Sequence, residues 1–199
     1  MRFSDDDHRW HEPADRAELR VERRSEGDGP PVIVGYAALF DVLSEEMRGF
    51  RERIAPGAFA ASLDAGDDVL GLFNHDPNFV LGRRSAGTLK VAEDDKGLRY
   101  EIQVPDTRAG EDVVNSIERG DIQGSSFGFV TIEDDWDETR TVRELRQIAL
   151  WDVSPVTYPA YAATNGQLGL RSRSRLVEAD QRQRMALARR RLDLAKATA

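Results

Sequence analysis

Short apolar runs bounded by turn-forming residues characterise the middle of the chain, roughly residues 32–159. The run at 32–40 is dense enough for a buried strand, and Gly35 within it predicts a bend or a bulge. A second apolar run at 68–76 also predicts a buried strand, with His75 at its exit. A folded domain therefore begins near residue 32.

Alternation of apolar and polar residues predicts further strands after these runs. Residues 88–105 alternate on both sides of an Asp-Asp-Lys-Gly turn, which is typical of a β-hairpin. Residues 125–137 and 141–159 have strand composition as well, and the polar stretch 134–140 is expected to form the tip between them. The pattern predicts at least six short strands.

Only two segments of this region have helical signatures. Pro56 followed by good helix formers predicts a short helix over 56–64. Thr107 is a suitable N-cap for a helix over 108–119, whose apolar residues fall on one stripe and which ends at Gly120. Two helices among six or more strands do not make regular β–α–β units, so we expect a mainly β fold with flanking helices (α+β), in the form of a mostly antiparallel barrel or sandwich.

The two ends differ from this central region. Residues 1–29 are charged and close on a Gly/Pro-rich break, which predicts a flexible N-terminal arm with a short strand at 19–23. Residues 171–199 are predicted to be a basic tail, and residues 176–197, rich in Ala, Leu and Arg, are expected to be helical at least when bound to a partner. The domain proper is expected at 30–170.

Composition and charge narrow the class of protein. The chain has 199 residues, 40% of them hydrophobic and 32% charged, which suits one globular domain with polar ends. It contains no cysteine, which excludes disulfides, thiol nucleophiles and thiolate-bound metals. The net charge is −8, but residues 171–199 carry nine Arg or Lys against three Asp or Glu, leaving −14 on the other 170 residues. An acidic body is unsuited to nucleic acid, and no apolar run is long enough to span a membrane.

His75, Ser126 and Asp152 are the candidate catalytic residues. His8 and His11 lie in the N-terminal arm, so His75 is the only imidazole in the predicted domain, although a lone histidine is more often structural. Ser126 lies in Gly-Ser-Ser-Phe-Gly, where a hydroxyl could be presented beside exposed backbone N–H groups. On spacing alone, a simple Gly/Ser turn before a strand is the more common explanation of such a stretch. The stretch matches the G-x-S-x-G elbow of α/β hydrolases, but those enzymes need a later histidine and none follows.

Asp152 is the candidate third member. It lies within the apolar run 148–153, and strict strand alternation would put it on one face with Ile148 and Leu150. A buried carboxylate needs partners, and His75 is an obvious one, while capping of backbone N–H groups is the alternative. Asp76, next to His75 in sequence, would point away from it along a strand.

With these residues in view, the chain resembles the prohead maturation proteases of tailed phages and of related gene-transfer particles. The resemblance covers about 32–170 through four landmarks in order: VIVGYAALFD, IAPGAFAASL, FNHD, and the pair GSSFGF and WDVSPVTYPA. The family is similar to the herpesvirus assemblins, which implies an antiparallel β-barrel, a serine nucleophile and a histidine base. Assemblins have a second histidine in third place, where this chain has Asp152. Ser126, preceding Phe-Gly-Phe, matches the family serine and is preferred to Ser125.

The resemblance implies a serine endopeptidase that works without a cofactor or metal. Its expected substrates are the scaffolding protein or the scaffold-like segment of the major capsid protein, and the enzyme itself. It is expected to act in the host cytoplasm inside the assembling prohead. Neither a membrane nor nucleic acid is expected as its partner, and a homodimer is expected by analogy with assemblins. The arm and the basic tail are candidate self-cleavage or capsid-targeting segments.

Two other classes of function compete with this hypothesis. A catalytically silent scaffold or capsid-assembly module with the same fold would act by binding alone. An esterase or amidase for small molecules would need a deep closed pocket in place of an open peptide groove.

Overall fold

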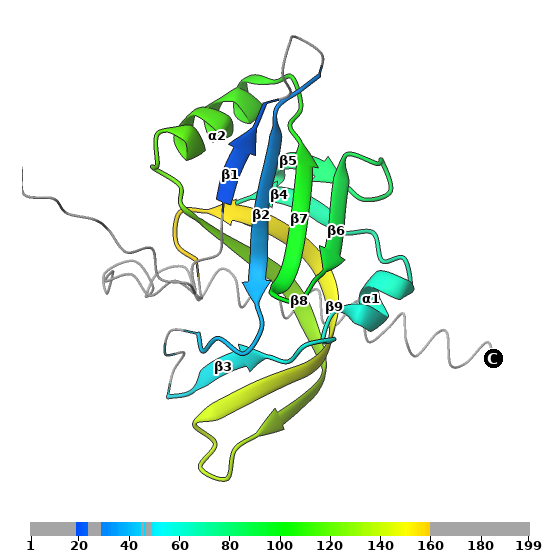
Figure 1. The fold of residues 1–199 in the computed structure, drawn as a ribbon, viewed down its shortest axis with the longest axis vertical. Helices are drawn as coiled ribbons and strands as arrows, with labels where there is room; N and C mark the ends of the chain where they lie inside the picture. Colours follow the sequence, from blue (N-terminus) through cyan, green and yellow to red (C-terminus); the bar gives the residue numbers. More distant parts are fainter. Residues whose placement is uncertain (1–18, 24–28, 45, 47–48, 160–199) are drawn as a thin grey trace, which may run out of the picture.

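A computed structural model of the protein describes residues 19–23, 29–44, 46 and 49–159. The predicted tail helix at 176–197, the basic tail and most of the arm lie outside these residues. The described chain forms nine strands and two helices (Figure 1). These are β1 (Leu19–Glu22), β2 (Val32–Leu39), β3 (Arg51–Ile54), α1 (Ala60–Asp64), β4 (Leu70–Phe73), β5 (Asp76–Arg83), β6 (Leu89–Glu93), β7 (Gly97–Gln103), α2 (Arg108–Glu118), β8 (Gly124–Trp136) and β9 (Val142–Val156).

The first sheet has four antiparallel strands in the order β1-β2-β7-β6. β6 and β7 form the predicted hairpin, and the predicted strand at 19–23 is confirmed as β1, which pairs with β2. The irregularity in β2 falls at Ala37, between Tyr36 and Ala38, and not at Gly35, which pairs regularly with both of its neighbours. The bulge brings the carbonyl of Ala38 against Gly97, where a Cβ would lie only 2.0 Å from that oxygen.

The second sheet is organised by β9. β8 pairs antiparallel with β9 over nearly its whole length. The opposite edge of β9 is shared by two shorter strands, which both run parallel to it: β3 pairs with 142–145 and β4 with 152–153. Between them α1 and the residues just before it fill the edge, because Ile148 N–H donates to the Ala58 carbonyl and Leu150 N–H to the Ser62 hydroxyl within the helix. β5 then pairs with β4 at the outer edge.

One hydrophobic core joins the two sheets and the helices. Buried side chains from the first sheet, such as Tyr100 and Ile102, belong to the same cluster as Leu145 and Val153 of β9. Phe59, just before α1, packs edge-on against Phe127 of β8 with the ring centroids 5.4 Å apart. Figure 1 shows α2 at one end of the molecule and the β8–β9 hairpin extending away at the other.

The predicted mainly β fold with few helices is confirmed, but a closed barrel is not found. The described strands form two separately hydrogen-bonded sheets, and the second contains two parallel pairings. Sequence alternation identifies strands but does not determine whether their outer edges meet, because closure depends on tilt and stagger across the whole sheet.

Individual elements match the predictions to different degrees. The helix expected over 108–119 is confirmed as α2, and the Thr107 side chain accepts a hydrogen bond from Gly110 N–H at 3.2 Å. The helix expected over 56–64 begins only at Ala60, because Gly57 has a φ of +85°, which a right-handed helix excludes. Neither described helix is long and apolar enough to cross a membrane.

Candidate functional site

His75 lies in a two-residue turn between β4 and β5. Both turn residues have positive φ, 54° for Asn74 and 56° for His75. Hairpin turns of type I′ require positive φ at both central positions, and asparagine and histidine adopt it more readily than most non-glycine residues. The predicted single strand over 68–76 is therefore shorter, ending at Phe73, and the turn projects the His75 ring beyond it.

The His75 ring contacts the Asp152 carboxylate directly. His75 Nδ1 lies 2.6 Å from Asp152 Oδ1, although the two residues are 77 positions apart in the chain. The Asp152 side chain is 5% exposed and that of His75 33%, so the carboxylate is buried while the imidazole still reaches solvent. Ser154 Oγ donates a second hydrogen bond to the same carboxylate oxygen, at 2.8 Å. A buried carboxylate with two donors of this kind is well satisfied.

A β-bulge in β9 sets the direction of the Asp152 side chain. Asp152 pairs with Gly128 and Leu150 with Phe129, so Trp151 is the inserted residue of the bulge. The bulge interrupts the alternation, and Val153 joins Leu150 in the core. The expectation that Asp152 shares a face with Ile148 and Leu150 was wrong, because strict period-two counting cannot anticipate an inserted residue.

Ser126 lies on the same face of the β8–β9 pair as Asp152. It is directly opposite Ser154, and two residues further along β8 Gly128 is directly opposite Asp152. Residues opposite one another in an antiparallel pair share a face, with Cβ atoms about 4.5–5.5 Å apart. Asp152 Oδ2 lies where a Gly128 side chain would begin, 2.1 Å from an ideal Cβ position, so only glycine leaves room for the carboxylate.

The neighbouring Ser125 faces the core instead. Its hydroxyl is 2.7 Å from the Tyr100 hydroxyl, and both residues are buried. Burial raises the pKa of Tyr100 because it desolvates the phenolate, so the phenol stays protonated in this pair. Ser126 is half-buried. The two serines thus point to opposite faces, and only Ser126 shares a face with His75 and Asp152.

Of the three predicted residues, His75 and Asp152 are therefore in direct contact, and Ser126 lies on the same face of the β8–β9 pair. In the part of the chain described, the Ser126 hydroxyl makes no hydrogen bond, and none links it to His75. Hydrogen bonds between a nucleophile and its base are often long without substrate and shorten when substrate binds.

Three residues around this site were not predicted from the sequence: Asn74, Gly128 and Ser154. Asn74 was recognisable, since an Asn-His pair between apolar runs suits a tight hairpin turn. Ser154 was recognisable too, because it lies two residues from Asp152 on a strand and so shares its face. Gly128 carries no local signal, because its role depends on which residue lies across the ladder.

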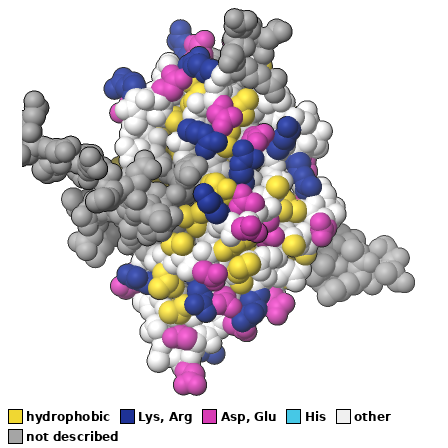
Figure 2. Space-filling view, in the orientation of Figure 1, with side chains coloured by type: hydrophobic (Ala, Val, Ile, Leu, Met, Phe, Trp, Pro, Cys, Tyr) yellow, Lys and Arg dark blue, Asp and Glu magenta, His cyan; other side chains and the backbone are white. Residues whose placement is uncertain are grey.

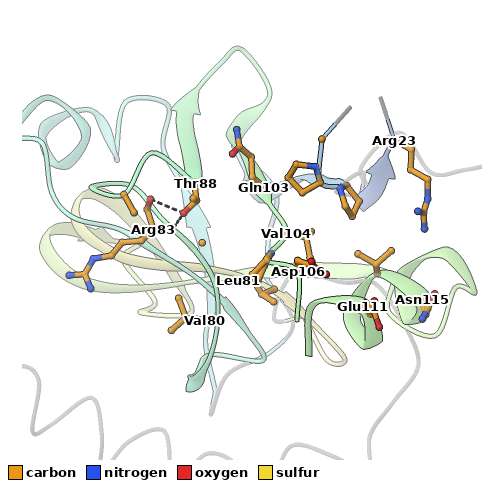
Figure 3. Close-up of a pocket in the computed structure, with 17 residues that line it drawn as sticks. Arg23, Val80, Leu81, Arg83, Thr88, Gln103, Val104, Asp106, Glu111 and Asn115 are labelled. Atoms are coloured by element: carbon orange, nitrogen blue, oxygen red, sulfur yellow. Dashed lines mark hydrogen bonds between the residues drawn. The ribbon is translucent and has the colours of Figure 1, made fainter. Parts of the chain in front are cut away.

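A separate cavity of about 1060 Å³ lies away from this site. Figure 3 shows β5 residues such as Val80 and Arg83 on one side of it and Glu111 and Asn115 of α2 on another. Its described lining contains neither a histidine nor any of the three candidate residues.

The face shown in Figure 2 carries acidic and basic side chains intermixed. Acidic and basic side chains also alternate along the first sheet, where Arg99 Nη1 lies 2.7 Å from Glu101 Oε1 and Lys90 Nζ 3.9 Å from Glu101 Oε2. The view shows no extended basic patch of the kind that nucleic acid requires.

Comparison with known proteins identifies the family. The profile of the family described as caudovirus prohead serine protease matches residues 18–179, and the chain belongs to this family, as its sequence landmarks predicted. Among its relatives, the prohead protease of Enterobacteria phage HK97 is 30% identical over 155 residues, which is 75% of this chain and 64% of that protein. The chain thus spans less than two thirds of that relative. The solved structure of the bacteriophage T4 capsid assembly protease, gp21, is similar with a TM-score of 0.47 and 15% identity, covering 72% of this chain and 96% of that chain.

Gly128→Ala tests the packing of the carboxylate. The new methyl group would occupy the position of Asp152 Oδ2, so the carboxylate must move and its hydrogen bond to His75 should break. We expect loss of the downfield Nδ1 proton signal of His75 in NMR spectra, with a destabilisation of about 1–3 kcal/mol in urea unfolding. Val130→Ala, further along β8, is the control and should leave the signal unchanged. Persistence of the signal in Gly128→Ala would show that the carboxylate does not depend on this space.

Proposed function

We propose that the protein is a serine endopeptidase of prohead maturation, with Ser126 as nucleophile, His75 as general base and Asp152 as the residue that orients His75. The observation that carries the proposal is the 2.6 Å contact between His75 Nδ1 and Asp152 Oδ1, on the face that also bears Ser126. Membership of the caudovirus prohead serine proteases supports the reaction class.

The contact at Nδ1 determines what the imidazole can do. An ionised carboxylate can only accept hydrogen bonds, so Nδ1 carries the hydrogen that it donates to Asp152, and Nε2 is left as the basic nitrogen. Nε2 takes the Ser126 hydroxyl proton as Oγ attacks the scissile carbonyl carbon. The C–N bond then breaks, the leaving amine receives that proton from His75, and an acyl-enzyme remains. Water, deprotonated by the same nitrogen, hydrolyses the ester and restores Ser126.

Asp152 would stabilise the imidazolium that forms during each proton transfer. Its burial strengthens this effect, since a charge pair interacts more strongly where water is excluded. Ser154 would hold the carboxylate in place through its 2.8 Å hydrogen bond. Backbone N–H groups near Ser126 are the proposed donors to the oxyanion.

The proposed substrates are the scaffolding protein, the scaffold-like segment of the major capsid protein, and the enzyme itself. The family description and the name of the HK97 relative support a role in the prohead. In this proposal residues 30–170 form the protease domain, and the arm and tail are cleavage or targeting segments. The enzyme would act as a homodimer inside the assembling prohead in the host cytoplasm.

Ser126→Ala is expected to abolish cleavage while preserving the fold. Loss of the nucleophile should reduce proteolysis of the co-expressed cognate capsid protein, and of the chain itself, by about 10⁴-fold or more, measured by intact mass. Ser125→Ala is the matched control, because Ser125 is bonded to Tyr100 on the other face and should remain active. An active, folded Ser126→Ala protein would refute the proposal and leave a catalytically silent assembly module as the alternative.

Asp152→Asn separates an orienting role from simple packing. An amide in place of the carboxylate can donate to Nδ1 and so favours the wrong imidazole tautomer, which should lower the cleavage rate by about 10³–10⁴-fold. Ser154→Ala keeps the carboxylate and removes one donor, so a loss within about 10-fold is expected. Comparable small losses in both variants would argue against Asp152 as the orienting residue.

A further inference from the structure

We infer that Asn74 is a positioning residue that fixes the His75 ring against Asp152. The inference rests on the proposed function and extends it to a residue outside the three catalytic ones. Asn74 lies in the β4–β5 turn and hydrogen-bonds to Pro155 of β9 and to Thr157, the residue that follows β9.

β4 and β9 share few ladder positions near the site. Their parallel pairing comprises only Leu70 with Asp152 and Gly71 with Val153. The next connection between the two segments is at Asn74, whose N–H donates to the Pro155 carbonyl at 3.0 Å. The turn that carries His75 thus extends beyond the regular ladder.

The Asn74 side chain adds two further hydrogen bonds to the end of β9. Its Oδ1 accepts from Thr157 N–H at 3.0 Å, and its Nδ2 donates to Thr157 Oγ1 at 3.3 Å. One amide therefore serves as acceptor and donor to a single residue. Together with the backbone bond, these contacts hold the turn to the strand that bears Asp152 and Ser154.

His75 depends on this attachment because of its backbone conformation. A histidine with a φ of 56° occupies a sparsely populated region, and such conformations persist where surrounding contacts hold them. A ring displaced by about 1 Å can cost about 100-fold in rate, since proton transfer requires close approach. Asn74 lies next to His75 and makes the side-chain contacts that hold the turn in place.

A series of substitutions at Asn74 separates the effect of its side-chain hydrogen bonds to Thr157 from the effect of the turn conformation. Asn74→Gly keeps a residue that accepts positive φ and retains the backbone bond to Pro155, but it removes both contacts to Thr157. Asn74→Asp keeps the Oδ1 acceptor for Thr157 N–H. Asn78→Ala is the control, because Asn78 is exposed in the same hairpin and bonds only to Asp76 among the described residues.

The probe is a fluorophosphonate, which reacts covalently with an activated serine and requires no knowledge of the natural substrate. We expect the limiting rate of Ser126 labelling, located by mass spectrometry, to fall about 10–100-fold in Asn74→Gly with little change in the half-saturating probe concentration. Asn74→Asp should recover most of the rate, and Asn78→Ala should match the wild type. The downfield Nδ1 proton signal of His75 should be lost in Asn74→Gly and retained in Asn74→Asp.

The outcomes distinguish this inference from the function on which it rests. Suppose that the wild-type protein is labelled at Ser126 and that Asn74→Gly shows the same rate and an intact His75 signal. This result would overturn the positioning role of Asn74 and leave the peptidase proposal standing. A change confined to the half-saturating concentration would also overturn it, because it would indicate contact with the probe instead. Absence of labelling at Ser126 in the wild type would refute the proposed function and the inference together.

Discussion

A buried carboxylate requires hydrogen-bond donors, and at Asp152 this requirement links distant parts of the chain. Its oxygen Oδ1 accepts a hydrogen bond from the Ser154 hydroxyl on the same strand. The same oxygen contacts the His75 ring, which comes from the β4–β5 turn. Its other oxygen occupies the space that Gly128 leaves on β8. The carboxylate is therefore the point at which β8, β9 and the β4–β5 turn meet.

β9 makes this meeting possible because it is long and has different neighbours along each edge. β8 lies along one edge. Along the other edge β3 comes first, then α1 with the residues just before it, and then β4. The bulge at Trp151 shifts the alternation of β9, so that Val153 after it faces the core like Leu150 before it. One strand can thus bury Leu150 and Val153 in the core while directing Asp152 and Ser154 to the opposite face.

Much of this arrangement was predictable from local sequence, and the exceptions have physical explanations. Alternation identified the β6–β7 hairpin and the long strands around Ser126 and Asp152, because side chains on half-buried strands repeat every second residue. β3 was missed because its four residues, RERI, are mostly charged. β5 was missed because it contains Pro77 and pairs with β4 in an irregular register, so its sequence does not alternate regularly. The site residues were identified by chemistry and resemblance, whereas the contact between His75 and Asp152 depends on the bulge and on the β4–β9 pairing. Neither of these features has a local signature.

The most direct test of the account is the separation between Ser126 Oγ and His75 Nε2 in an experimental structure of the wild-type protein. If Ser126 and His75 work as nucleophile and base, the two atoms should lie about 4 Å apart or closer, near enough for proton transfer once substrate orders the site. A packed layer of side chains between the two atoms, or a His75 ring whose Nε2 points away from β8, would contradict it.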